Sequence, residues 1–311
     1  MSDTPIIYRF TQNLQQNMSN RKVYNISWGS HSLEFGKRTC IMGIVNVTPD
    51  SFSDGGKFFG PDEAIAQGEK LAKEGADILD IGGESTRPFS DPVSAEEELR
   101  RVLPVIEALV RNVSIPISID TTKAVVAREA LKAGASILND VGALRVDPAI
   151  SRVAADFGVP VILMHMLGTP KTMQVDPVYG DLFGEIRSFL EMAIKTASEN
   201  GIPRSKIIID PGIGFGKSLT HNLLLIRHLD QLKPLDVPIL VGPSRKAFLR
   251  NLLKEEGEED IPPDLPVVET GTQAAIAASI LNGAHIVRVH NAADTRATAK
   301  IVDALLNADL P

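Results

Sequence analysis

Residues 206–232, KIIIDPGIGFGKSLTHNLLLIRHLDQL, contain one complete unit of the pattern that decides the fold. Residues 206–210 form a short apolar run rich in β-branched side chains, as expected for a strand of a parallel sheet that is buried on both faces. Residues 219–232 have the apolar spacing of an amphipathic helix, and a glycine-rich turn joins the two segments. The stretch therefore predicts a β-strand, a tight turn and a covering helix.

The same unit recurs eight times along the chain. The apolar runs lie at residues 40–47, 77–82, 116–120, 136–140, 159–165, 206–210, 237–242 and 285–290. Helical patterns lie at residues 61–75, 94–110, 122–134, 147–158, 180–200, 219–232, 270–283 and 292–306. Alternating elements predict an α/β protein with a parallel sheet, and eight units favour a (β/α)8 TIM barrel of about 250 residues. A doubly wound open sheet is the alternative, disfavoured because no G-x-G-x-x-G follows the first strand.

The rest of the chain predicts small additions to this barrel. Residues 1–38 are expected to be an N-terminal extension, in which segment 23–36 forms a hairpin around Gly29 that closes one end of the barrel. Residues 39–311 then form the barrel domain, with the acidic segment 254–266 as a solvated loop. Ser94, followed three residues later by Glu97, has the pattern of a capping box at a helix start.

Composition is typical of a soluble globular protein. Of the 311 residues, 43% are hydrophobic and 23% are charged, and the net charge is −7. Such an acidic chain is not expected to hold nucleic acid by its overall field. Cys40 is the only cysteine, which excludes an internal disulfide framework and fits a reducing compartment. We find no signal-peptide run and no apolar stretch of about 18 residues, so we expect a cytoplasmic protein that does not engage a membrane.

Polar side chains end most of the predicted strands. The carboxyl ends of parallel strands meet at one rim of a barrel, where active sites are built, so these residues predict a shared site. For any one of them the alternative is a helix cap or a bond to a loop amide. The residues are Asn46, Asp80, Asp120, Asn139, Asp140, His165, Asp210, Arg288 and His290.

Segment 210–218, DPGIGFGKS, approaches the P-loop pattern but has Pro211 where that pattern needs glycine. Proline offers no backbone N–H to a phosphate, so we reject a nucleoside triphosphate site here. Lys217 remains either a site residue or a solvated lysine after a tight turn. His165 has no cysteine or histidine at metal-binding spacing, and we expect a buried, hydrogen-bonded histidine there.

Two long loops and two cationic segments suit an anionic substrate. In loops 46–56 and 83–92, Thr86 and Arg87 could bind a phosphate oxygen, and Asn46 could ligate a hard divalent ion. Segments 242–246 and 288–295 follow the last two strands, where such barrels commonly bind phosphate. These segments supply Arg245, Lys246, Arg288 and His290. We expect at least one of the two arginines to pair with a structural carboxylate.

Together the motifs resemble those of the dihydropteroate synthases of the folate pathway, from about residue 38 to the C-terminus. In the family's order they are IMGIVNVTPDSFSDGG, DIGGESTRP, SIDT, NDV, MHMLGTP, DPGIGFGK, SRKAF and RVH. The resemblance implies a (β/α)8 transferase that condenses 6-hydroxymethyl-7,8-dihydropterin pyrophosphate with 4-aminobenzoate. It also implies 7,8-dihydropteroate and pyrophosphate as products, Mg2+ as the cofactor and a homodimer formed through the late helices.

The same resemblance implies a role for each matching residue. The pterin pocket is expected to contain Asp120, Asn139, Asp210 and Lys246. The pyrophosphate group is expected to meet Asn46, which also serves as the metal ligand, with Arg288 and His290. The 4-aminobenzoate site is expected to contain Thr86, Arg87, Phe215 and Lys217. The residues expected to act in catalysis are Thr86, Arg87 and Lys246.

Three positions depart from the family's usual residues. Leu167 stands where glutamine is common, Ala247 where many members carry serine beside the benzoate carboxylate, and Asn291 where aspartate is usual. Because Ala247 and Asn291 differ from the family's usual residues, they support one alternative, which is a barrel that binds a pterin without catalysing a reaction.

Two further alternatives remain at this stage. A pterin-binding methyltransferase domain would share the barrel and the carboxylates, but the TPDSFSDGG, STRP and SRK motifs suit pyrophosphate displacement better than methyl transfer. An unrelated phosphate-binding aldolase or isomerase would need a catalytic lysine inside a strand. The predicted strands carry none in their interiors.

Overall fold

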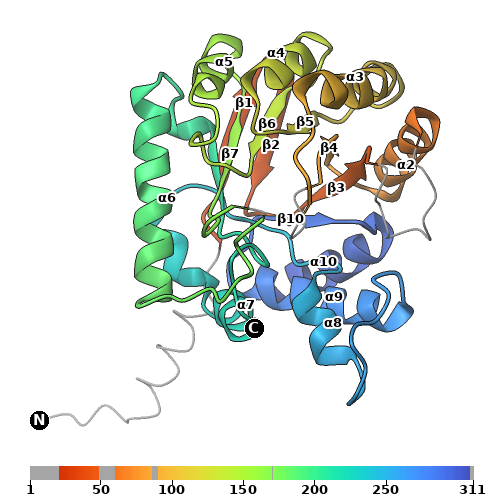
Figure 1. Cartoon of the computed structure of the whole chain (residues 1–311), viewed down its shortest axis with the longest axis vertical. Helices are drawn as coiled ribbons and strands as arrows, with labels where there is room; N and C mark the ends of the chain where they lie inside the picture. The colour runs from red at the N-terminus through yellow and green to blue at the C-terminus, as the bar shows by residue number, and fades with distance from the viewer. Residues whose placement is uncertain (1–20, 49–59, 86–89, 170, 309–311) are drawn as a thin grey trace, which may run out of the picture.

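Eight parallel strands form the central sheet of the molecule. The computed structural model describes residues 21–48, 60–85, 90–169 and 171–308. The strands are hydrogen-bonded in the order β8-β7-β6-β5-β4-β3-β10-β9, and a parallel bridge between Ile209 and Ile239 joins the two ends of that order. The sheet thus curls into a barrel (Figure 1), which confirms the predicted (β/α)8 fold.

Each strand lies within one of the predicted apolar runs, because those runs are buried from both sides. The strands are β3 (Cys40–Asn46), β4 (Ile78–Gly82), β5 (Ile117–Asp120), β6 (Ile137–Asp140), β7 (Val161–Met164), β8 (Ile207–Asp210), β9 (Leu240–Val241) and β10 (Ile286–Val289). Asp120 lies opposite Gly82 on one side and Asn139 on the other, and Met164 lies opposite Asp210. This register brings the predicted polar strand ends to one rim.

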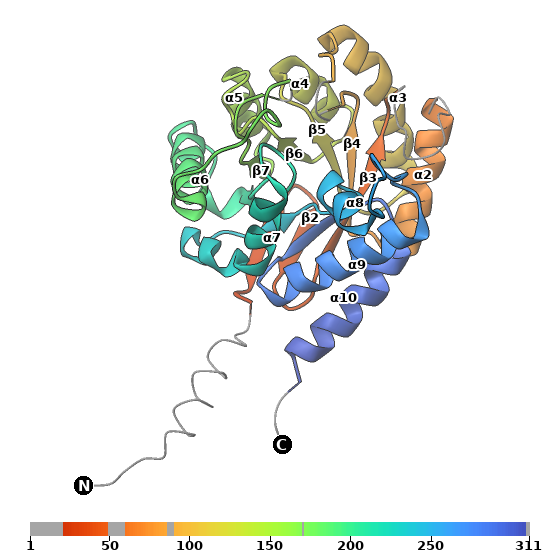
Figure 2. The ribbon, with the colours of Figure 1, turned by 60° about the horizontal axis from the view of Figure 1, so that its bottom comes forward.

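Helices surround the barrel (Figure 2). They are α2 (Pro61–Glu74), α3 (Ala95–Asn112), α4 (Ala124–Lys132), α5 (Ala149–Phe157), α6 (Leu182–Glu199), α7 (Leu219–Arg227), α8 (Ala247–Leu253), α9 (Pro266–Leu281) and α10 (Ala292–Leu306). The helix expected over 219–232 ends at Arg227, and a 3-10 helix, η3 (Leu229–Leu235), follows it. A second 3-10 helix, η2 (Arg204–Lys206), precedes β8.

The predicted capping box at the start of α3 is only half formed. The Ser94 side chain accepts a hydrogen bond from the Glu97 backbone N–H, as expected for a cap. The Glu97 carboxylate, however, pairs with Arg100 and Arg101 one turn further on. A complete capping box lies instead at α7, where Ser218 and His221 exchange bonds.

A two-stranded hairpin covers the amino-terminal end of the barrel. Its strands, β1 (Tyr24–Trp28) and β2 (His31–Phe35), pair antiparallel around Gly29, as expected. Tyr24 makes an edge-on ring contact with His285, which directly precedes β10. Arg21 donates to Thr39 before β3 and to the Ala284 carbonyl. The hairpin therefore lies at the end opposite the polar rim, while the boundary at residue 38 stays a prediction.

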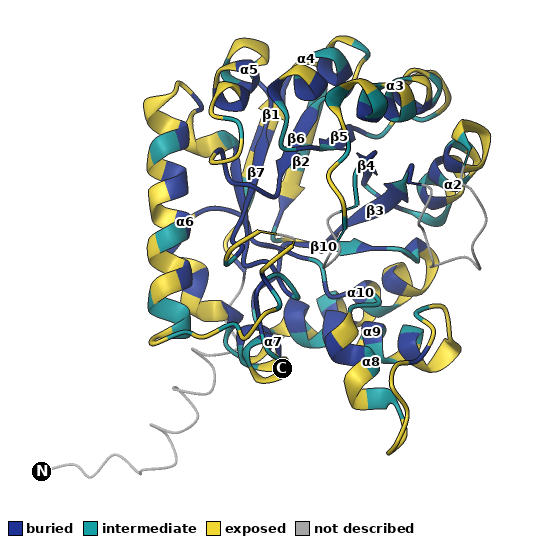
Figure 3. Ribbon diagram, in the orientation of Figure 1, coloured by how far each residue is buried: buried dark blue, intermediate teal, exposed yellow. Residues whose placement is uncertain are grey.

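Burial follows the layers of the fold. The barrel strands and the inner faces of the helices are mostly buried, and the outer helix faces are exposed (Figure 3). The buried apolar side chains of the hairpin, Ile26, Trp28 and Phe35, belong to the same core as those of the barrel. Among the described residues, no helix is both long enough and apolar enough to cross a membrane.

Candidate active site

A cavity lined by both polar and apolar side chains opens among the carboxyl ends of the strands, with a volume of about 450 Å³ that includes its opening to solvent. Its polar lining consists of Asp120, Asn139, Asp210, Ser244, Lys246, Arg288 and His290. Its apolar lining includes Ile44, Val141, Met164 and Phe215. The cavity thus unites the four predicted pterin residues with two of the predicted pyrophosphate residues and with Phe215.

Arg288 links two buried carboxylates inside the barrel. Its Nε donates to Asp80 Oδ2 at 2.6 Å, and one terminal nitrogen donates to Asp120 Oδ2 at 2.9 Å. The expectation that one arginine of these segments pairs with a carboxylate is therefore confirmed. Burial raises the pKa of Asp120 to about 8; the nearby Asp80 charge adds to this rise, whereas Arg288 opposes it.

Asp210 is held in place by the turn that follows β8. Its Oδ1 accepts a bond from the Gly212 N–H at 2.7 Å, and burial raises the pKa of the carboxyl. Gly212 has φ +70°, and a Cβ atom there would lie only 1.9 Å from the His165 carbonyl oxygen. Only glycine fits this turn, which explains the glycine in the DPGIGFGK motif.

Lys246 enters the cavity from the loop after β9. Its ammonium donates to the Ile213 carbonyl and lies 4.0 Å from the centre of the Phe215 ring. Burial lowers the pKa of Lys246 to about 7, although the negative charge of Asp210 partly opposes the change. Lys246 is thus a cation whose charge depends on pH near neutrality.

Ser244 is a cavity residue that our sequence reasoning passed over. Its Oγ lies 2.9 Å from His290 Nδ1 and also accepts a bond from the His290 N–H. The serine therefore fixes the imidazole ring from two sides. The sequence signal for Ser244 is its place at the start of the SRKAF motif, directly before the two cations Arg245 and Lys246.

Lys217 lies outside the cavity lining. It is 3% exposed, and its Nζ lies 3.0 Å from His165 Nδ1 and donates to the Phe215 carbonyl. Burial lowers the pKa of Lys217 to about 7 and that of His165 to about 3, the latter with help from the Lys217 charge. His165 is thus the buried, hydrogen-bonded histidine that was expected. The lysine joins the turn after β8 to the end of β7, and a direct role with 4-aminobenzoate stays a prediction.

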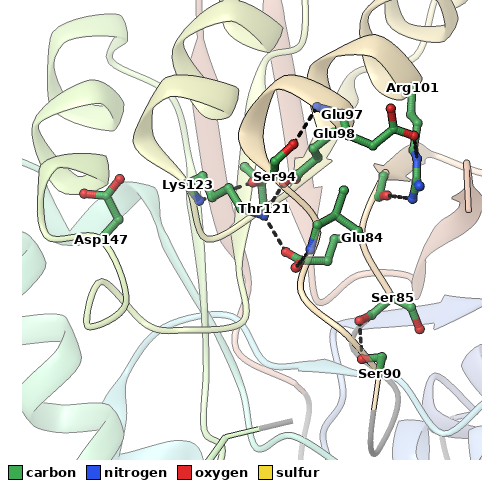
Figure 4. A network of polar contacts seen from close by, with 12 residues as sticks. Glu84, Ser85, Ser90, Ser94, Glu97, Glu98, Arg101, Thr121, Lys123 and Asp147 are labelled. Atoms are coloured by element: carbon green, nitrogen blue, oxygen red, sulfur yellow. Dashed lines mark hydrogen bonds and ion pairs between the residues drawn. The ribbon is translucent and has the colours of Figure 1, made fainter. Parts of the chain in front are cut away.

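The described ends of the loop between β4 and α3 are held by a partly buried ion-pair network (Figure 4). Lys123, just before α4, donates to both Glu84 and Glu98. The other oxygen of Glu84 accepts from the Val93 N–H, which closes the base of the loop. Thr86 and Arg87, expected to act on 4-aminobenzoate, lie outside the described residues, as does most of the 46–56 loop.

The only protein group here that our sequence reasoning assigned to a metal is the amide oxygen of Asn46. Asn46 ends β3, which neighbours β10 and its Arg288, but it is not part of the cavity lining. No group of three or more His, Cys, Asp or Glu side chains suited to a metal occurs among the described residues. Mg2+ usually keeps several waters and binds through one or two protein oxygens plus substrate phosphates. A single amide oxygen from Asn46, near the cation Arg288 that is expected to bind phosphate, fits this way of binding Mg2+.

The sequence that forms this site matches a known protein family. Residues 42–290 match the family of pterin binding enzymes. The chain belongs to this family. The matched range includes every candidate residue from Asn46 to His290, and membership in the pterin binding enzymes excludes the unrelated aldolase or isomerase barrel.

Individual members of the family are similar over nearly the whole chain. The "Dihydropteroate synthase" of Synechocystis sp. is 47% identical over 277 residues, which cover 89% of this chain and 93% of that protein. The Yersinia pestis dihydropteroate synthase, solved with a sulfonamide drug, is 41% identical with a TM-score of 0.85, covering 92% and 100% of the two chains. The Xanthomonas albilineans enzyme, solved with 4-aminobenzoic acid, is 43% identical with a TM-score of 0.83, covering 93% and 100%.

Proposed function

We propose that this chain is a dihydropteroate synthase. It condenses 6-hydroxymethyl-7,8-dihydropterin pyrophosphate with 4-aminobenzoate, and it releases 7,8-dihydropteroate and pyrophosphate in folate biosynthesis. The observation that carries this proposal is the cavity itself, where hydrogen-bond acceptors meet the cations Lys246 and Arg288 at one rim of a barrel of the pterin binding family.

The acceptors suit the ring of the pterin. A dihydropterin edge carries N–H and NH2 donors, and Asp120, Asp210 and Asn139 offer acceptor oxygens to it. Lys246 can donate to the ring carbonyl from the same cavity. Phe215 adds an apolar face beneath the lysine. This arrangement would hold the methylene carbon of the substrate in a fixed place.

The cations suit the leaving group. The bond between the pterin methylene carbon and the pyrophosphate oxygen breaks with its electron pair on the oxygen. Arg288 and His290 would stabilise that growing negative charge. When bound, Mg2+ would also stabilise the negative charge on the leaving pyrophosphate. Asn46 is the protein group proposed to hold it.

The incoming amine needs positioning more than a base. The amine of 4-aminobenzoate is an aniline and is already neutral at pH 7, so its lone pair forms the new C–N bond and one proton is then released. We propose that Thr86, Arg87 and Phe215 position this substrate, with Lys217 supporting the Phe215 turn. Exclusion of water would protect the cation-like methylene group from hydrolysis.

Two points about the wider protein belong to the same proposal. A homodimer through α9 and α10 is supported by exposed apolar residues on these helices, among them Val267, Leu281, Ile301 and Leu305. A cytoplasmic location is supported by the single, buried thiol of Cys40. Light scattering of the purified chain tests the homodimer, since a mass of one chain would contradict it.

The test of the reaction is pyrophosphate release by the purified chain. Release with Mg2+ and pterin pyrophosphate should depend on added 4-aminobenzoate, and dihydropteroate should form in equal amount. Tight pterin binding without release would instead favour the non-catalytic barrel or the methyltransferase domain. Omitting Mg2+ in a parallel assay checks the proposed cofactor.

A further inference from the structure

Asp80 lies directly behind two cavity residues without lining the cavity itself. It is completely buried within β4. One oxygen, Oδ2, accepts both Arg288 Nε at 2.6 Å and Asn139 Nδ2 at 3.0 Å. A single carboxylate oxygen thus contacts both a predicted pterin residue and a predicted pyrophosphate residue.

This contact decides which end of the Asn139 amide faces the ligand. An asparagine amide has an oxygen and an NH2 group of nearly equal size, so either end could face the cavity. A carboxylate paired with a guanidinium only accepts hydrogen bonds, and it therefore requires the NH2 end. The oxygen of Asn139 remains the group that this side chain can offer to the cavity.

The same contact orients Arg288. The Nε bond to Asp80 fixes the plane of the guanidinium, and one terminal nitrogen of that plane meets Asp120. The orientation of Arg288 thus depends on Asp80 as much as on Asp120. The other oxygen, Asp80 Oδ1, is buried without a hydrogen-bond partner among the described residues, so the contacts of Asp80 Oδ2 with Arg288 and Asn139 are the ones through which this side chain acts.

We propose that Asp80 is a positioning residue that fixes Asn139 as a hydrogen-bond acceptor toward the edge of the ring ligand that carries N–H groups. Together with Asp120 and Asp210, this gives three acceptor side chains and selects a ring edge rich in N–H donors. The inference rests on the proposed function for the identity of that ring.

A side-chain exchange tests the proposal. Asp80→Asn removes the charge that orients Asn139, and Asn139→Asp places a second carboxylate against Asp80. Each single variant should bind 6-hydroxymethyl-7,8-dihydropterin about tenfold more weakly in calorimetry. In the double variant, the new asparagine at position 80 can donate to the new carboxylate at position 139, which again offers an acceptor to the cavity. Its affinity should exceed that of both single variants.

Asp140→Asn provides the matched control. Asp140 is an equally buried carboxylate at the end of β6, but it accepts from the backbone N–H groups of Gly142 and Leu144. Combining Asp140→Asn with Asn139→Asp should give no recovery. Multiplied losses in the Asp80→Asn, Asn139→Asp double variant would overturn the proposal and leave Asp80 as a purely structural residue.

Two further outcomes are decisive. If a single variant fails to fold, a folded double variant that binds the pterin supports the pairing, and an unfolded double variant overturns it. Failure of the proposed function would appear separately, as wild-type protein that releases no pyrophosphate in the presence of 4-aminobenzoate. The calorimetric comparison uses the pterin alone and does not depend on turnover.

Discussion

At the scale of single residues, Asp120 and Lys246 should make the affinity for the pterin depend on pH in opposite directions. The pKa of Asp120 is raised to about 8 and that of Lys246 is lowered to about 7. Pterin binding needs the charged carboxylate, which is lost as pH falls, and the charged ammonium, which is lost as pH rises. Calorimetric affinity for 6-hydroxymethyl-7,8-dihydropterin should therefore peak between these two values and fall on both sides.

The two arms of this profile can be separated. Asp120→Asn should weaken binding at every pH, because a donor replaces an acceptor, and it should also reduce the acidic arm to the part that comes from Asp210. The alkaline arm, which comes from Lys246, should remain. An affinity that stays constant from about pH 6 to about pH 9 in the wild type would contradict both assignments.

Gly212 makes a second prediction at this scale. A Cβ at its φ of +70° would collide with the His165 carbonyl oxygen at 1.9 Å. Gly212→Ala should therefore lower the free energy of unfolding by about 3 kcal/mol, measured by urea denaturation. Gly29→Ala is the control, because Gly29 also has a positive φ but no atom lies within 4 Å of its Cβ position. Its cost should be only about 1 kcal/mol; equal losses would mean that the collision is relieved cheaply.

At the scale of elements, Lys123 joins β5, α3 and the loop after β4. Its removal leaves Glu98, whose side chain is 0% exposed, without its cation. Lys123→Met should therefore destabilise the fold by about 3 kcal/mol in urea unfolding. Lys123→Met with Glu98→Gln should recover part of that loss, because the buried charge is gone.

Lys132→Met is the matched surface control for this prediction. Lys132 pairs with Glu129 on the exposed face of α4, and its side chain is 57% exposed. Exposed pairs contribute about 0–1 kcal/mol, so Lys132→Met should change stability very little. A similar small change for Lys123→Met would show that the network does not hold the loop base.

The strands of this fold could be predicted from the sequence more accurately than the ends of its helices. The short apolar runs predicted all eight barrel strands, because a strand that is buried on both faces consists almost entirely of apolar residues. Helix ends were less certain, because they depend on local chemistry. Pro266 begins α9 four residues before the expected start at 270, and α8 (Ala247–Leu253) was not predicted as a helix. The short α8 has too few turns to give a clear apolar period.

The site was predictable to a similar degree. Asp120, Asn139, Asp210 and Lys246 were found because polar residues ended apolar strands or matched a motif, and the structure gathers them in one cavity. The contacts of Asp80 with Asn139 and Arg288, and of Ser244 with His290, were not predictable, because they depend on which side chains face each other across the barrel. No spacing along the chain contains that information.

At the scale of the whole molecule, the hairpin and the barrel share one core. Trp28 is the only tryptophan of the chain and lies in the hairpin, so its fluorescence reports that element alone. Urea unfolding followed by Trp28 fluorescence and by far-ultraviolet circular dichroism should give coincident transitions. Phe35→Ala should shift both midpoints together, at a cost of about 3–5 kcal/mol. An earlier fluorescence transition would make the β1–β2 hairpin a separate folding unit.

The Arg21–Asp303 ion pair brings the beginning of the described chain against the last helix, at the end of the barrel that faces away from the cavity. The two ends of the described chain, near residues 21 and 308, therefore lie on the same side of the molecule. A fusion partner or a solid support attached at either of these two positions would stand behind the barrel. An immobilised enzyme of this kind would keep the mouth of its cavity turned toward the solution that carries its substrates.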